Sequence, residues 1–341
     1  MAGWTLFSQA QHKHSRVSEL QHTPEDLRWA TPEIVARYRA KRLRLQGKTL
    51  VDVGCGIGFQ TVAFAQVFEK VYAVEIDSEK IKRAEENARI LGLKNIEFIH
   101  GDALDPAVIR KVKTVEILFS DPERLPEEEE RAVDTIQPDL AQLLAAYAPL
   151  TEKIAVELPP QIKSVPFPDG ELEYLSVGGK LNRLTWYSPK LKQSPWSAVV
   201  LPSEERLEMK EGAKLSKREK LGTYLYEADP AVVKAGLLAE LSADTETALF
   251  SEGKAVFFTG KSLIKSAFFA NTFKVLGSGS FQEKEVISLL RKTGAGKVVL
   301  RYPVDPKEYW NIRKKWEQPL SGKKKVCLFQ FGSRAAVGER V

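Results

Sequence analysis

Cysteine and histidine are scarce in this chain of 341 residues, which has two cysteines, Cys55 and Cys327, and four histidines. Two cysteines cannot build a disulfide framework or a cysteine-based zinc site, and the spacing of the histidines predicts no metal ligands. The sequence therefore favours a reducing compartment and no resident metal.

Long apolar runs are also missing. No stretch of 18 apolar residues occurs, so we expect no membrane span. Residues 1–12 lack the charged-then-apolar layout of a secretory signal, and we expect a cytoplasmic location. The length and a hydrophobic content of 43% allow two or three domains, each with its own core.

The most informative stretch that is present is a glycine-rich turn after a buried strand, in residues 51–59. A helix and a second strand that ends at Glu75 are expected to follow. Strand, glycine turn, helix, strand and acid is the order in which a parallel α/β sheet forms a nucleotide-sized pocket. The dinucleotide fingerprint is excluded because the sixth position, counted from Gly54, is Phe59 and not glycine. The turn also has no lysine of the phosphate-binding kind.

The pattern Asp-x-Gly-x-Gly-x-Gly resembles motif I of class I S-adenosylmethionine-dependent methyltransferases. The resemblance continues through the second strand (71–77) and the third strand (95–99) to Asp102. It implies S-adenosylmethionine as cofactor, with Glu75 on the ribose hydroxyls and Asp102 at the adenine amine. The predicted cofactor-binding residues are Asp52, Gly54, Gly56, Gly58, Glu75 and Asp102.

A fourth strand (115–119) is expected to end at Asp121-Pro122, where this class of enzyme presents its reactive face. A carboxylate and the carbonyl beside a proline can accept hydrogen bonds from the two N–H groups of an exocyclic amine and aim its lone pair at the methyl group. Asp121 and Pro122 are therefore the predicted catalytic residues. Amino-methyltransferases of nucleic acids carry a second proline and an aromatic residue next, but Glu123 and Arg124 stand here. A proline-terminated strand with a capping aspartate is the alternative.

Substrate contacts are predicted around this loop. Arg124 can stack on a base or bind a phosphate. Before the glycine turn, Thr31-Pro32-Glu33 has the residue types of a helix start, with Thr31 as N-cap. The helix of residues 34–43 carries Arg37, and in many class I enzymes such a helix lines the substrate entrance. Thr31 and Arg37 are therefore predicted substrate-binding residues, although a plain packing helix with a basic face fits as well.

One methylation chemistry is disfavoured by the residues present. Transfer to carbon 5 of a pyrimidine requires a cysteine nucleophile that attacks carbon 6. After the glycine turn the next cysteine is Cys327, far into the second half. The sequence therefore disfavours carbon-5 methylation.

Charge is distributed unevenly. From Met209 onward the chain has 24 Lys and Arg against 14 Asp and Glu, and before it 27 against 31. A basic half joined to a neutral-to-acidic half favours a polyanionic partner such as RNA. A charged surface that serves solubility and heat resistance is the alternative.

The second half predicts a small α/β domain. Expected helices are 231–241, 282–292 and 306–316, and expected strands include 256–259, 267–276, 297–302 and a last strand at 325–331. Most aromatic residues there, Trp310 and Trp316 among them, are expected in the core. We predict a helical lead-in at 1–45, a methyltransferase domain at 46–205 and a basic domain at 221–341.

Nearly the whole chain resembles one family, the class I methyltransferases with a C-terminal THUMP-like domain. The resemblance is carried by residues 28–33, the glycine turn, Asp121-Pro122-x-Arg124 and residues 226–237. A more distant likeness is to trimethylguanosine synthase, whose Asp-Pro-Pro-Trp motif is not reproduced. The family implies a Rossmann-like α/β sheet plus a smaller C-terminal α/β domain, and structured RNA as substrate.

The sequence thus predicts methyl transfer to tRNA or rRNA, on an exocyclic base amine such as guanine N2. Transfer to a protein or small molecule is one alternative, and a non-catalytic RNA-binding protein with this fold is another. No membrane contact and no obligate protein partner are predicted.

Overall fold

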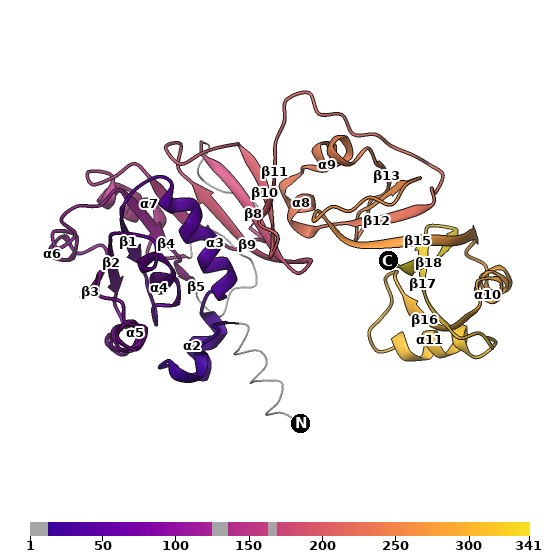
Figure 1. Cartoon of the computed structure of the whole chain (residues 1–341), viewed down its shortest axis with the longest axis horizontal. Coiled ribbons are helices and arrows are strands. Elements are labelled where there is room, and N and C mark those ends of the chain that lie inside the picture. The colour runs from indigo at the N-terminus through magenta and orange to yellow at the C-terminus, as the bar shows by residue number, and fades with distance from the viewer. Residues whose placement is uncertain (1–12, 125–135, 163–168) are drawn as a thin grey trace. The chain divides into compact units, whose positions relative to one another are not determined.

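The computed structural model describes residues 13–124, 136–162 and 169–341. The chain forms two compact units, which are described separately (Figure 1). The first unit comprises Met1–Leu175 and Asn182–Ser197, and the second comprises Ser176–Leu181 and Ala198–Val341.

A parallel sheet forms the centre of the first unit. Its strands run in the order β7-β4-β1-β2-β3, all parallel, and β9 lies antiparallel beside β7. The sheet continues through β8, β10 and β11, and its residues from Ala198 onward are assigned to the second unit. The bounds are β1 Thr49–Val53, β2 Lys70–Glu75, β3 Ile96–His100, β4 Ile117–Ser120, β7 Ile154–Leu158, β8 Glu171–Val177, β9 Lys180–Tyr187, β10 Trp196–Leu201 and β11 Glu205–Glu208.

The strand order reverses at β1, which has β2 on one side and β4 on the other. In doubly wound sheets the ligand binds outside the carboxyl ends of the strands at such a reversal. The site is therefore expected where β1 and β4 end. The predicted α/β arrangement is present in the first unit.

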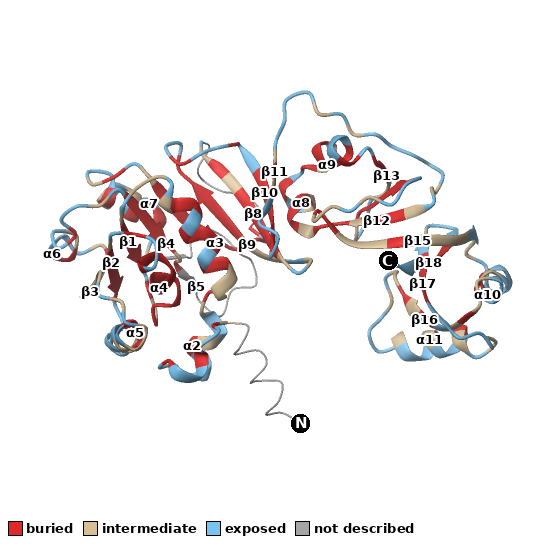
Figure 2. Cartoon of the chain, viewed as in Figure 1, coloured by how far each residue is buried: buried red, intermediate tan, exposed pale blue. Residues whose placement is uncertain are grey.

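Helices cover this sheet because their apolar faces match its buried strands. Ala36, Ala40 and Leu43 of α3 pack with Phe64 of α4 and Phe119 of β4 in one core cluster. Figure 2 shows β1 and β4 largely buried, whereas α5 keeps an exposed outer face. The bounds are η1 Val17–Glu19, α2 Pro24–Trp29, α3 Glu33–Arg44, α4 Phe59–Ala65, α5 Ser78–Ile90, α6 Pro106–Ile109 and α7 Leu140–Tyr147, with a short ribbon of β5 Glu123–Arg124 and β6 Ile136–Gln137.

One predicted cap is wrong. Helix α3 begins at Glu33 with Pro32 as its N-cap, and no side chain caps it. The Thr31 hydroxyl instead donates to Asp121, 90 positions along the chain. A long-range carboxylate partner has replaced the local capping bond that the residue types predicted.

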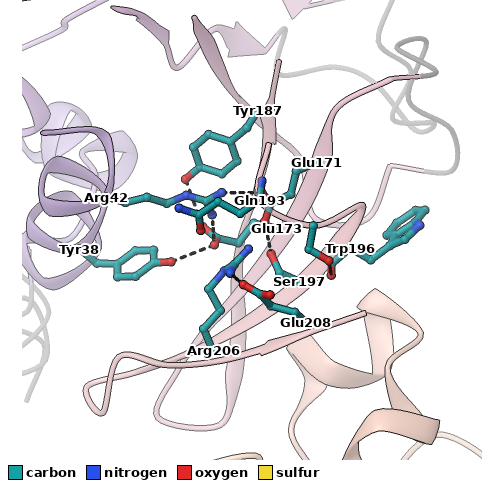
Figure 3. A network of polar contacts seen from close by, with 11 residues as sticks. Tyr38, Arg42, Glu171, Glu173, Tyr187, Gln193, Trp196, Ser197, Arg206 and Glu208 are labelled. Carbon is teal, nitrogen blue, oxygen red and sulfur yellow. Dashed lines mark hydrogen bonds and ion pairs between the residues drawn. The ribbon is translucent and has the colours of Figure 1, made fainter. Parts of the chain in front are cut away.

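Polar groups buried in the first unit join α3 to the antiparallel strands (Figure 3). Arg42 of α3 forms ion pairs with Glu171 and Glu173 of β8, and all three side chains are at most 7% exposed. Tyr38 and Tyr187 donate their hydroxyl protons to Glu173 at 2.9 and 3.1 Å. Arg42 also lies over the Tyr187 ring, 3.6 Å from its centroid. Paired in this way, the charges can remain buried.

The second unit contains a seven-stranded sheet in the order β13-β14-β12-β15-β18-β17-β16. Its only parallel pair among the described strands is β16 with β17. The bounds are β12 Tyr224–Ala228, α8 Pro230–Ala235, α9 Leu238–Thr245, β13 Ala248–Ser251, β14 Phe257–Gly260, β15 Phe269–Ser280, α10 Glu283–Lys292, β16 Ala295–Leu300, α11 Tyr309–Glu317, β17 Lys324–Phe331 and β18 Arg334–Arg340.

Two predictions for the second unit are wrong. The single helix expected at 231–241 is divided into α8 and α9, because Gly236 adopts a φ of 72° and ends α8. The strand expected to be last is followed by β18, which pairs with both β15 and β17. Most aromatic residues are in the core as expected, but Trp310 is 68% exposed.

Replacing Arg42 by methionine is expected to lower the free energy of unfolding by about 3–5 kcal/mol, because two buried carboxylates then lose their ion pairs with Arg42. Urea unfolding of both proteins measures the change. Lys82→Met is the matched control, because Lys82 and its partner Glu79 are both more than 60% exposed, and it should change stability by less than about 0.5 kcal/mol. Equal stability of the Arg42 variant and the parent would show that the buried ion pairs of Arg42 do not stabilise the fold.

Candidate active site

The glycine turn joins β1 to α4 at the reversal of the sheet. Gly54, Gly56 and Gly58 have φ values of 76°, 56° and 83°, in the left-handed region that favours glycine. A Cβ on Gly58 would lie 3.1 Å from the Cβ of Ala84, so this glycine lets α5 pack closely. A Cβ on Gly56 would meet no described atom within 4 Å. The turn therefore borders open space at Gly56, where a ligand can approach the backbone.

Glu75 ends β2 beside this turn. The residue is 6% exposed, and its carboxylate accepts from the backbone N–H of Gly56 at 2.8 Å and from that of Asp77 at 3.0 Å. These two bonds fix the carboxylate at the carboxyl ends of the strands. Each of its oxygens retains a lone pair that can accept from a hydroxyl group.

Asp102 follows β3 and is exposed. Its carboxylate accepts from the backbone N–H of Leu104 at 2.9 Å. Nearby on α7, Tyr147 is fully buried, and its hydroxyl has no hydrogen-bond partner among the described residues. Burial, and next the charge of Asp102, raise the pKa of Tyr147 to about 12. The hydroxyl therefore remains protonated and available as a donor.

Asp52 lies in β1, just before the turn, and is buried. It is 1% exposed, and its carboxylate accepts from the Thr61 hydroxyl at 2.6 Å. Burial raises its pKa from 3.8 to about 7; the Thr61 bond opposes this rise and the charge of Asp121 adds to it. Through this bond Asp52 connects the end of β1, just before the turn, to α4.

Asp121 and Pro122 follow β4 directly, next to the glycine turn. A Cβ on Gly54 would lie 3.6 Å from the backbone oxygen of Asp121. The Thr31 hydroxyl donates to the Asp121 carboxylate at 3.3 Å. The structure therefore brings the predicted catalytic aspartate, the first glycine and Thr31 together.

Lys13 is a neighbour of this loop that no sequence motif indicated. Its ammonium group donates to the backbone oxygen of Ala30 at 2.6 Å. Burial, followed by the charge of Arg183, lowers the pKa of Lys13 to about 8, and the charge of Asp121 opposes this fall. A cation thus lies near the Asp121 carboxylate.

The remaining predicted substrate residues are not gathered at this point. Arg37 is exposed on α3 and pairs with Glu33 at 2.6 Å. No described contact joins it to Asp121. The backbone of Arg124 pairs with that of Ile136 in the β5–β6 ribbon. The Arg124 side chain lies outside the described part of the structure, as do residues 125–135.

Within the described ranges, no group of three or more His, Cys, Asp and Glu side chains is arranged to hold a metal ion. The helices described there include none that is long and apolar enough to cross a membrane.

Comparison with known proteins gives three findings for this chain. A family model described as RNA cap guanine-N2 methyltransferase matches residues 47–159. An uncharacterized S-adenosylmethionine-dependent methyltransferase of Mycobacterium tuberculosis is 26% identical over 301 residues, 85% of this chain and 80% of that protein. An uncharacterized RNA methyltransferase of Halalkalibacterium halodurans is 45% identical over 56 residues, 16% of this chain and 12% of that protein.

One solved structure is similar along the chain. A methyltransferase structure from Porphyromonas gingivalis W83 superposes with a TM-score of 0.78 at 19% identity, and covers 98% of this chain and 87% of that one. At this identity the likeness concerns the fold. It confirms the predicted Rossmann-like α/β sheet with an additional C-terminal sheet.

The raised pKa of Asp52 predicts a pH dependence of stability. Between pH 4 and 7 the folded protein holds a proton at Asp52 that the unfolded chain, with its ordinary pKa of 3.8, has released. The contribution of Asp52 to stability therefore falls as the pH rises through this window. Asp52→Asn keeps an acceptor for Thr61 and removes the titration. Relative to this variant, the parent should lose about 1 kcal/mol per pH unit, measured by urea unfolding. Parallel pH curves would show that Asp52 ionises normally.

Proposed function

We propose that this chain, which is an S-adenosylmethionine-dependent methyltransferase, methylates structured RNA such as tRNA or rRNA on an exocyclic base amine, with guanine N2 as the leading candidate. The observation that carries the proposal is the position of Asp121-Pro122 beside Gly54, at the strand reversal where this fold binds its cofactor. The matching family model is described for guanine N2, and several relatives are named RNA methyltransferases.

The residues around the turn fit the cofactor. Gly56 borders open space, Glu75 has free acceptor capacity for the ribose hydroxyls, and Asp102 can accept from the adenine amine. Tyr147 adds a buried donor without a partner among the described residues. Bound there, S-adenosylmethionine supplies a methyl group on a positively charged sulfur.

The protein contributes position more than acid–base power. The Asp121 carboxylate accepts a hydrogen bond from one N–H of the amine, and the backbone oxygen next to Pro122 accepts one from the other N–H, which leaves the nitrogen lone pair directed at the methyl group. The Thr31 hydroxyl holds the carboxylate in place. After transfer the amine releases one proton to water. Orientation of this kind accounts for a large part of catalysis when two groups must meet.

Carbon-5 methylation of a pyrimidine is disfavoured by the cysteines. One relative over 55 residues is a tRNA/tmRNA (uracil-C(5))-methyltransferase from Nitratiruptor. That chemistry uses a cysteine thiolate, but burial raises the pKa of Cys55 well above its usual value. Cys327 lies in β17 of the second unit, and burial raises the pKa of its thiol as well. An amine acceptor agrees better with these residues.

The second unit is proposed as the RNA-binding part, in the manner of a THUMP-like domain. Its excess of Lys and Arg suits phosphate contacts, which give affinity without much sequence reading. Arg124 and Arg37 remain proposed substrate contacts at the edge of the first unit.

The direct test is transfer of labelled methyl from S-adenosylmethionine to unmodified tRNA and rRNA. Asp121→Asn is expected to lower the rate at least about 100-fold, because the amine loses its charged acceptor, while cofactor affinity changes little. Glu79→Gln, on the exposed face of α5, is the control and should transfer at the parental rate. Nucleoside analysis identifies the methylated atom. Cofactor binding without label in any RNA would refute the proposal.

Tyr147→Phe separates cofactor binding from folding. The buried hydroxyl has no partner among the described residues in the free protein, so its removal should leave stability unchanged or slightly higher. The same change should weaken cofactor binding about 3–10-fold, because one hydrogen bond is lost. Calorimetric titration with S-adenosylhomocysteine and thermal unfolding measure the two effects. Unchanged affinity would place Tyr147 outside the cofactor site.

A further inference from the structure

The positive charge of the second unit is concentrated at its C-terminal end. Residues 281–341 contain 14 Lys and Arg against 6 Asp and Glu, whereas the rest of the chain has 37 against 39. The net positive charge of this segment is therefore larger than that of the whole chain, which is +6. A polyanion is the partner that such a segment attracts.

The segment folds around its own core. Helix α11 crosses over between the parallel strands β16 and β17, and α10 precedes β16 (Figure 1). Val286, Leu290 and Trp316 pack with the strands in one apolar cluster. Because Trp316 supplies the inward face of α11, the opposite face of the helix is free of this packing task.

Trp310 lies on that opposite face and is 68% exposed, more than any other large hydrophobic residue of the described second unit. Its ring contacts the edge of Tyr309 at 5.4 Å between centroids. The Arg313 guanidinium lies 5.3 Å from the ring centroid, and Glu317 holds this arginine at 2.9 Å. The indole is thus held in one orientation but is largely exposed to solvent, which is unfavourable for a large apolar ring in the free protein.

Basic residues precede and follow the indole along the chain. Lys307 lies in the turn before α11, three positions before Trp310, and Lys314 lies on the helix four positions after it; both are exposed. Neither ammonium group has an ion-pair partner among the described residues. Trp310, Arg313 and Lys314 share a face of α11, because residues three and four apart on a helix do so. These three residues and Lys307, in the turn just before the helix, are named the α11 stripe.

We propose that the α11 stripe binds an unpaired segment of RNA, with a base stacked on Trp310 and the neighbouring phosphates on Lys307, Arg313 and Lys314. An aromatic platform between cations is the arrangement that single-stranded nucleic acid requires, since every base has a stacking face and every linkage a charge. The proposal rests on RNA as the substrate and adds where the RNA is held.

The experiment measures binding of the full chain to a labelled RNA hairpin with an unpaired loop, and to a blunt duplex of the same composition, by fluorescence anisotropy over a salt series. Trp310→Leu is expected to weaken hairpin binding about 5–100-fold with little change in salt dependence. Trp310→Tyr should retain most of the affinity because it keeps a stacking ring. Duplex binding should change little in both variants.

Lys314→Ala tests the charged part of the stripe. It should lower the slope of log affinity against log salt by about 0.7–0.9, the loss of one phosphate contact. Lys284→Ala, an exposed lysine on α10 outside the stripe, is the charge-matched control and should leave hairpin affinity close to that of the parent.

Unchanged hairpin affinity in Trp310→Leu, or an equal loss on hairpin and duplex, would overturn the stacking proposal. Labelled methyl transfer distinguishes this failure from failure of the proposed function. If the parent methylates RNA while Trp310→Leu binds and methylates equally well, the stripe is refuted and RNA methylation stands. If Trp310 controls hairpin binding but no RNA is methylated, the stripe stands and the proposed function fails.

Discussion

The burial of two arginines on α3 is the constraint on which the first unit depends. Arg39 pairs with Glu157 of β7, and Arg42 pairs with Glu171 and Glu173 of β8. A buried guanidinium is tolerable only while its carboxylate partners remain in place, so each pair restricts the helix to one position on the sheet. The helix in turn fixes the segment before it. That segment delivers the Thr31 hydroxyl to Asp121.

Arg39 also links this constraint to the electrostatics of the site. It donates to Gln60 of α4 at 2.7 Å and lies 4.8 Å from the centroid of the Phe119 ring in β4. Its charge opposes the rise in the pKa of Asp52. The buried cation of Arg39 thus stabilises the negative charge of the acidic edge, where the strands end. An acidic edge suits a cofactor whose reactive sulfur is positive.

In the proposed function, the two units divide the work by charge. The glycine turn and the Asp121-Pro122 loop lie in the first unit, and the basic excess lies in the last 61 residues of the second (281–341). Phosphate contacts need only a dense field of cations, whereas amine orientation needs fixed acceptors at short range. This division accounts for fixed acceptors in one unit and exposed basic side chains in the other.

The sequence alone determined the features that local pattern can encode. The glycine turn, the acids after successive strands and the alternation of helix and strand depend on residues close together in the chain. The fold class, the cofactor and methyl transfer followed from them. Asp121 was predicted because it ends a strand.

Only the tertiary structure decided which distant side chains meet. The bond of Thr31 to Asp121 and the approach of Lys13 to the same carboxylate join segments that no periodicity relates. Trp310 and Trp316 are six positions apart and look alike in the sequence, yet one is 68% and the other 6% exposed. Burial is a property of the packed fold: it depends on which face of a helix meets the sheet, and that face is set by contacts far along the chain.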